Sequence, residues 1–246
     1  MCEVLVVHNS VILGAALHWH SLSWPKFSFW LVLLVILACI SAGVSVLLWK
    51  KFVTVKRAKL VAAALAVLMI LLAALWSERP AYAIYLLAVS APITALALID
   101  AKTYRLPNKL TYPLAAASIL GVCIAGIVEN DAPGILRAIG AAFLLMAAYF
   151  LQVVISWGKG MGLGDVKLSF SLGMILGYLS WMHVFLATAI AYIVAGLLGV
   201  VLLLARRATR KTAIPFGPFM VGGYWVALLL SHFLSHFPSS FLPHLA

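Results

Sequence analysis

Long apolar runs separated by short polar loops occupy the chain from about residue 28 to its end. A helix of about 20 apolar residues has the length needed to cross the hydrocarbon core of a bilayer. The pattern predicts spans at residues 28–49, 60–76, 81–100, 110–128 and 137–157, a double span within 166–205 that divides near 177–183, and a last span that ends near 236. These eight spans predict an all-α, polytopic membrane protein.

The same pattern indicates one membrane domain rather than several soluble ones. Residues 1–27 hold a shorter apolar stretch, which is broken by His8, Asn9 and Ser10. This stretch is short for a span, so we interpret residues 1–27 as a periplasmic or interfacial segment. Residues 28–246 are then a single helical membrane domain.

Composition and charge agree with this picture. The chain is 65% hydrophobic and only 9% charged, which excludes an ordinary soluble domain. Its net charge is +11, and 14 of its 17 Lys and Arg residues fall in four alternate loops, at 50–59, 101–109, 158–167 and 206–211. Cytoplasmic loops of membrane proteins are enriched in such residues, so this face is predicted to be cytoplasmic and both termini external. The positive charge therefore reports orientation and requires no nucleic acid partner.

The acidic residues are few and are divided between the two predicted faces. Four of the six fall on the external face: Glu3, Glu78, Glu129 and Asp131. Asp100 and Asp165 alone fall on the cytoplasmic side, each at the edge of an apolar span. An ionisable group in such a position is costly to desolvate, so by default it marks a functional site. The two aspartates lie at the same membrane depth, and two neighbouring helices can bring them together.

Two carboxyl groups in one site favour acid–base chemistry. Both cannot ionise cheaply, so one keeps a proton while the other is anionic. Such a pair can activate a water molecule and protonate a leaving amine. The residues alone fit equally well two separate structural acids, each bonded to a helix end or to a lysine such as Lys102 or Lys167. A transporter or channel that uses both aspartates as proton or cation sites is a further alternative, although such sites usually lie near the membrane midplane.

The stretch GKGMGLGDVKLS at residues 158–169 places four glycines at alternate positions before Asp165. Glycine lets backbone or a neighbouring helix approach where a larger residue would clash. We therefore interpret Gly162, Gly164 and Lys167 as a loop that supports Asp165, with a plain turn between two helices as the alternative. The spacing of a phosphate-binding loop is absent.

No metal site is predicted. The three cysteines are widely separated and form no CxxC pair. His232 and His236 have the i, i+4 spacing of a metal-binding pair. No acidic or cysteine ligand lies near them in the sequence, so we interpret them as interfacial residues.

Three segments resemble, in the same order, the motifs of type IV prepilin peptidases. They are IDAKTYRLPNKLTYPL at 99–114, GLGDVKL at 162–168 and TAIPFGPF at 212–219. The resemblance covers about residues 80–230 and implies an intramembrane aspartic protease of the GxGD type, with Asp100 and Asp165 as its catalytic pair. Asn108 stands where many members have an aspartate, which points to Asp100 as the reactive residue. We interpret the motif formed by Pro215, Phe216, Gly217 and Pro218 as a possible access route for substrate.

The resemblance also implies partners and a location. Members of the family lie in the bacterial cytoplasmic (inner) membrane and remove basic leader peptides from type IV prepilins or from the pseudopilins of type II secretion. Membrane lipid and such a substrate are thus the expected partners. Many members also methylate the new N-terminus with S-adenosylmethionine and carry an insert with two CxxC pairs. The corresponding loop at 50–59 is short and has no cysteine, so methylation is in doubt, and no cofactor is expected unless that activity is retained. An inactive assembly subunit of a secretion system is the remaining alternative, and the intact acid pair argues against it.

Overall fold

A computed structural model describes residues 80–157, 161–206 and 215–230, together with positions 36, 40, 43, 44, 47, 65, 67–69 and 71. These isolated positions are helical and fall within the predicted spans at 28–49 and 60–76. The predicted N-terminal segment, residues 1–27, lies outside the described residues. Throughout the described part of the chain the regular elements are helices, which confirms the all-α class.

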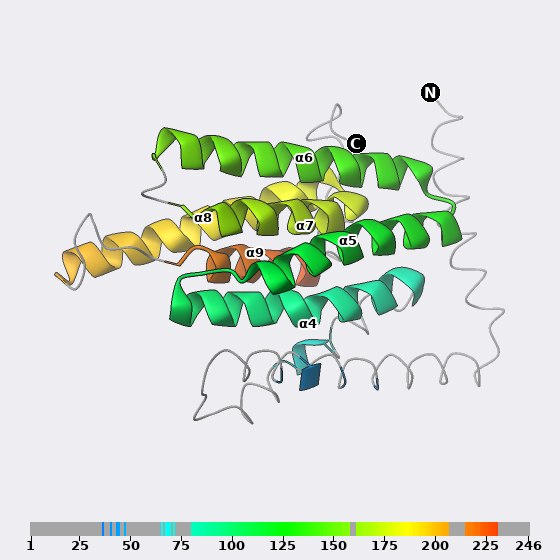
Figure 1. The fold of residues 1–246 in the computed structure, drawn as a ribbon, viewed down its shortest axis with the longest axis horizontal. Coiled ribbons are helices and arrows are strands. Elements are labelled where there is room, and N and C mark those ends of the chain that lie inside the picture. The colour runs from blue at the N-terminus through cyan, green and yellow to red at the C-terminus, as the bar shows by residue number, and fades with distance from the viewer. Residues whose placement is uncertain are drawn as a thin grey trace.

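Six helices are described continuously, and Figure 1 shows them side by side in one bundle. Their bounds are Pro80–Thr103 (α4), Asn108–Val128 (α5), Ala132–Ile155 (α6), Leu163–Leu179 (α7), Trp181–Leu204 (α8) and Gly217–Leu229 (α9). Four of them, α4, α5, α6 and α8, are long and apolar enough to cross a membrane. The chain is therefore a polytopic membrane protein, and the total of eight spans stays a prediction.

The predicted double span divides at Ser180, inside the interval expected from the sequence. Ser180 has extended backbone angles, φ −172° and ψ 164°, so it ends α7. Its side-chain oxygen accepts a hydrogen bond from the backbone N–H of His183, which caps the start of α8.

Helix α7 is the central element of the bundle. It contacts α5, α6, α8 and α9, and 12 of its 17 residues are buried. Small residues bring α6 and α7 into close contact: a Cβ atom at Gly173 would lie 2.7 Å from the Cα atom of Ala142. Close backbone approach at small residues is the usual way in which helices associate inside a membrane.

Helices α4 and α7 run antiparallel. The hydroxyl of Tyr82, near the start of α4, donates a hydrogen bond of 2.7 Å to the carbonyl oxygen of Ile175, near the end of α7. The rings of Tyr82 and Tyr178 have centroids 5.0 Å apart. The end of α4, with Asp100, therefore lies at the same end of the bundle as the start of α7, with Asp165.

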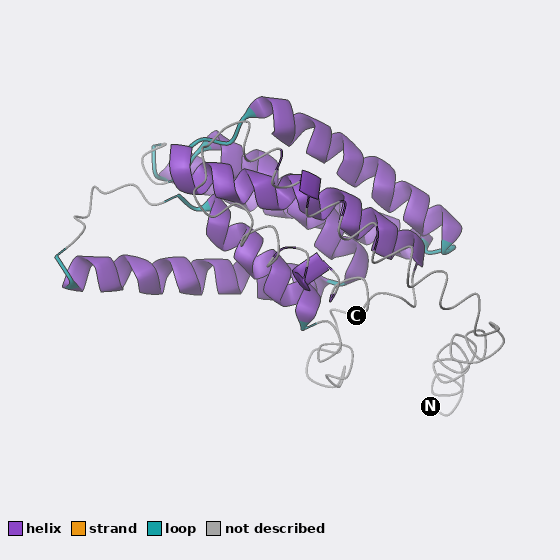
Figure 2. Cartoon of the chain, turned by 90° about the horizontal axis from the view of Figure 1, so that it is seen from below, coloured by secondary structure: helices purple, strands orange, loops and turns teal. Residues whose placement is uncertain are grey.

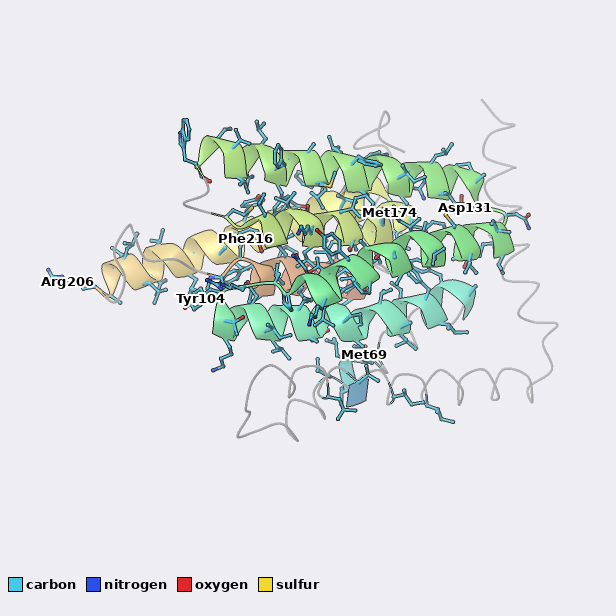
Figure 3. The ribbon with its side chains drawn as sticks, in the orientation of Figure 1. Met69, Tyr104, Asp131, Met174, Arg206 and Phe216 are labelled. Carbon is cyan, nitrogen blue, oxygen red and sulfur yellow. The ribbon has the colours of Figure 1, made fainter. Side chains whose placement is uncertain are left out.

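The four acidic residues in the described part of the chain are separated as the sequence predicts, and Glu3 and Glu78 lie outside it. Tyr104, which follows α4, and Phe216, which precedes α9, lie at one end of the bundle in Figure 3, whereas Asp131 lies at the other end. Glu129 also lies at this second end of the bundle. Its Oε2 accepts a hydrogen bond of 3.0 Å from the hydroxyl of Tyr178, which is near the end of α7. Which end faces the cytoplasm stays a prediction.

Two helix boundaries differ from the sequence prediction. Helix α7 begins at Leu163, so Gly164 and Asp165 lie in its first turn and not in a loop. Helix α9 begins at Gly217, inside the motif of residues 215–218 that we interpreted as an access route. Pro218 is compatible with this start, because the N–H groups of a first turn have no partner within the helix.

Helix α8 departs from the bundle toward its C-terminal end. Figures 1 and 2 show the part of α8 that ends at Leu204 extending beyond the other helices. Apolar side chains are exposed along this part, and they include Ile193, Val194, Leu197, Val201 and Leu204.

Candidate active site

Asp100 lies one turn before the end of α4 and is 5% exposed. Its Oδ2 accepts a hydrogen bond of 3.0 Å from the backbone N–H of Gly217, the first residue of α9. A Cβ atom at position 217 would lie only 2.7 Å from that oxygen, so glycine is required for this contact. The positive end of the α9 dipole also favours a carboxylate here.

Asp165 lies in the first turn of α7 and is 7% exposed. Its Oδ2 accepts a hydrogen bond of 3.2 Å from the backbone N–H of Gly162. Both carboxyl groups are buried, and they lie close enough to each other to interact electrostatically. Residues 65 positions apart in the sequence are thus brought together, as the sequence predicted.

Gly164 lets the loop between α4 and α5 lie against the first turn of α7. A Cβ atom at Gly164 would lie 2.8 Å from the Cβ atom of Leu106, which belongs to that loop. The loop directly follows the helix that carries Asp100. Close approach at Gly164 therefore connects the backbone that carries one aspartate with the backbone that carries the other.

Lys167 connects α7 to α5. Its Nζ donates hydrogen bonds of 2.8 Å to Oδ1 of Asn108 and 3.0 Å to the hydroxyl of Tyr112. The same Nζ lies 4.6 Å from the centroid of the Tyr112 ring, within the range of a cation–π interaction. Lys167 thus fixes the first turns of α5 and α7 to each other. Its partner Asn108 is the position at which many type IV prepilin peptidases, the family that the sequence resembles, have an aspartate.

An aromatic wall, which we define as Tyr149, Tyr192 and Phe216, flanks the two aspartates. The ring centroids are 5.9 Å apart for Tyr149 and Tyr192, 5.1 Å for Tyr192 and Phe216, and 6.1 Å for Tyr149 and Phe216. Both tyrosines lie near Asp165.

The sequence interpretation missed Tyr149 and Tyr192, because aromatic residues inside apolar runs do not differ from ordinary lipid-facing or core residues. It named Phe216 and Gly217, and both reach the site. Pro215 and Pro218 flank them along the chain. Within the described residues no group of three or more His, Cys, Asp or Glu residues could hold a metal ion. His232 and His236 lie outside the described residues.

Comparisons with known proteins bear on this same part of the chain. Residues 87–200 match the profile of the Type IV leader peptidase family. Three curated relatives carry the name prepilin leader peptidase/N-methyltransferase. The protein from Aeromonas hydrophila is 32% identical over 138 residues, or 56% of this chain and 46% of the relative. The one from Pseudomonas aeruginosa is 31% identical over 137 residues, with the same two shares, and the one from Pseudomonas putida is 30% identical over 147 residues, or 60% and 50%.

The chain spans about half the length of the curated relatives it matches. No protein of solved structure gives a significant match. The matched segment contains both aspartates, the glycines before Asp165 and the residues that connect α5 to α7. Through this segment the chain is similar to the type IV leader peptidase family.

Proposed function

We propose that the protein is an intramembrane aspartic endopeptidase that uses Asp100 and Asp165 as its catalytic pair. The observation that carries the proposal is that the carboxyl groups of Asp100 and Asp165 are both buried and interact with each other. Each of them also accepts a hydrogen bond from a backbone N–H. The site lies within the segment that matches a peptidase family. The comparisons give no support to the transporter alternative.

The pair performs hydrolysis by moving protons in opposite directions. The ionised carboxylate takes a proton from a water molecule, whose oxygen attacks the carbonyl carbon of the scissile peptide bond. The protonated partner donates its proton to the carbonyl oxygen, and a tetrahedral intermediate forms. The carboxyl group that took the proton from water then passes it to the leaving nitrogen. The other carboxylate takes a proton from a hydroxyl of the intermediate as the carbon–nitrogen bond breaks, so the pair again holds one proton. No metal or organic cofactor takes part in this cycle.

The substrates we propose are type IV prepilins or type II secretion pseudopilins, cleaved at the cytoplasmic face of the bacterial inner membrane. Two lines of support are the names of the curated relatives and the family motifs. The predicted cytoplasmic loops are basic, so charge cannot draw a basic leader toward them. We infer that the apolar helix of the substrate docks laterally from the membrane. The ionised aspartate and anionic lipid then attract the leader.

Cleavage of a purified prepilin or pseudopilin in membranes tests this function. Liposomes that contain the enzyme and substrate should yield a shortened product, and mass spectrometry should locate the new N-terminus at the leader boundary. The same spectrum, recorded with and without S-adenosylmethionine, reports whether a methyl group is added. The loop at 50–59 has no cysteine, so this measurement decides whether methyl transfer accompanies cleavage. An intact substrate after incubation with folded enzyme would overturn the proposed activity.

Gly217→Ala is expected to lower cleavage by about 10- to 100-fold, because the new methyl group displaces the Asp100 carboxylate that Gly217 now holds. Gly222→Ala is the matched control. It lies on the same helix, but a Cβ atom at Gly222 meets nothing within 4 Å. The two variants should be compared for cleavage rate at equal amounts of folded protein. Equal rates would show that the contact with Asp100 has no part in positioning the carboxyl group.

A further inference from the structure

Helices α6 and α8 are loosely joined compared with their neighbours. Helix α6 packs along α7, and α8 packs along α9, whereas α6 and α8 contact each other sparingly. One contact lies near the start of α8, where a Cβ atom at Gly140 would be 3.7 Å from the Trp181 ring. Further contacts lie at the site, where the rings of Tyr149 and Tyr192 pack and the hydroxyl of Tyr192 donates a hydrogen bond of 2.7 Å to Oε1 of Gln152.

A narrow cavity of about 10 Å³ lies between these contacts. Leu145 and Tyr149 of α6 and Ala187, Thr188 and Ala191 of α8 line it, and Leu172 and Leu176 of α7 and Met220 of α9 complete its lining. We call the boundary formed by the five residues of α6 and α8 the α6–α8 seam. Side chains across an unfilled boundary lose dispersion contacts that a packed one would have. Separating α6 from α8 therefore costs less packing than separating α6 from α7.

The seam leads to the aspartates. Tyr149 belongs both to the seam and to the aromatic wall, and it interacts electrostatically with Asp165. Tyr192, one helical turn beyond Thr188, packs against Phe216, which immediately precedes the glycine that holds Asp100. The hydrogen bond between Tyr192 and Gln152 thus closes the seam at the level of the catalytic pair.

From this arrangement we propose that the α6–α8 seam is the lateral entrance for the apolar helix of a membrane-embedded substrate, and that the Tyr192–Gln152 hydrogen bond is its latch. This inference rests on the proposed peptidase function. It also explains why the C-terminal part of α8 leaves the bundle (Figure 2), because a diverging helix leaves room beside the latch.

The chemistry of the two helices defines the occupant. Their exposed side chains are aliphatic or aromatic, and they include Leu144, Phe150, Leu151 and Ile155 on α6 and Ile193, Val194 and Leu197 on α8. A polar peptide between such surfaces would lose its hydration without gaining hydrogen bonds. A helix satisfies its own backbone groups and can replace lipid on these surfaces. Its end must then unwind beside the aspartates before the peptide bond can be cleaved.

A reversible tether across the seam tests the proposal. Leu145→Cys and Thr188→Cys are combined in a chain whose Cys2, Cys39 and Cys123 are replaced by Ser, and a short bis-methanethiosulfonate reagent joins the two thiols. The control pair, Phe143→Cys and Phe170→Cys, connects α6 to α7, where the two rings now lie 5.6 Å apart. Each enzyme is assayed in liposomes with a full-length substrate and with a short peptide that contains the cleavage site but no apolar helix.

The seam tether is expected to lower cleavage of the full-length substrate about tenfold or more and to leave cleavage of the short peptide unchanged. Reduction of the tether should restore cleavage of the full-length substrate. The α6–α7 tether should change neither rate. Unchanged cleavage of the full-length substrate by the tethered enzyme would overturn the entrance, and so would an equal loss with both substrates. Failure of the untethered enzyme to cleave either substrate would instead overturn the proposed peptidase function.

Discussion

Asp100→Asn and Asp165→Asn are each expected to remove essentially all cleavage, by roughly 100- to 10,000-fold. Each change keeps the side-chain volume but removes one carboxyl group from the shared buried site. With one carboxyl group left, no partner holds the proton that must be exchanged with water and the leaving nitrogen. Because the two residues act as one unit, the double variant should be no slower than either single variant.

Both variants should still fold, because removing a charge at the membrane edge lowers the cost of desolvation. Asp131→Asn is the matched control. Asp131 lies at the opposite end of the bundle, where its side chain accepts a hydrogen bond of 2.9 Å from the N–H of Gly134, and asparagine caps a helix equally well. The measurement is cleavage of a pseudopilin in membranes by all four variants at matched protein levels. A single Asn variant that works at near wild-type rate would contradict the catalytic pair.

Gly164→Val should abolish cleavage while leaving the protein inserted in the membrane. The first atom added at Gly164 would lie 2.8 Å from the Cβ atom of Leu106, and the two further methyl groups of valine need more space still. The loop that follows Asp100 must then move away from the turn that carries Asp165. Displacements of about 1 Å between reacting groups are enough to lower a rate about 100-fold.

Gly196→Val separates this local effect from the general cost of a β-branched residue in a helix. Gly196 lies in α8, and a Cβ atom there meets nothing within 4 Å. Cleavage rates and the amount of folded protein after detergent extraction should be compared for both variants. Full activity of Gly164→Val would mean that the glycines before Asp165 serve only as a linker.

Much of the architecture was predictable from the sequence because membrane helices are defined by length and hydropathy. The division of the double span near Ser180 followed from its length alone, and the grouping of Asp100 with Asp165 followed from their membrane depth. The N-terminal ends of α7 and α9 were harder to predict. Both contain glycine or proline, which in a soluble protein would favour a loop, but here they begin helices.

The contacts inside the site could not be predicted. Gly217 and Asp100 are 117 residues apart, and Lys167 and Asn108 are 59 apart. Helices that are apolar on all sides give no periodic signal of which face meets which neighbour. For the same reason Tyr149 and Tyr192 could not be identified from the sequence, since their approach to Asp165 depends on how α6, α7 and α8 are placed around it.

The hydrogen bond from Gly217 to Asp100 has a consequence for biosynthesis. A ribosome makes the chain from its N-terminus, so both aspartates are translated before the residue that holds the first of them. A nascent chain with α4 to α8 in the membrane therefore has both acids but lacks the backbone amide that fixes Asp100. The site becomes complete only when α9 is inserted, so the proposed peptidase should stay inactive until membrane insertion of its own chain is nearly finished.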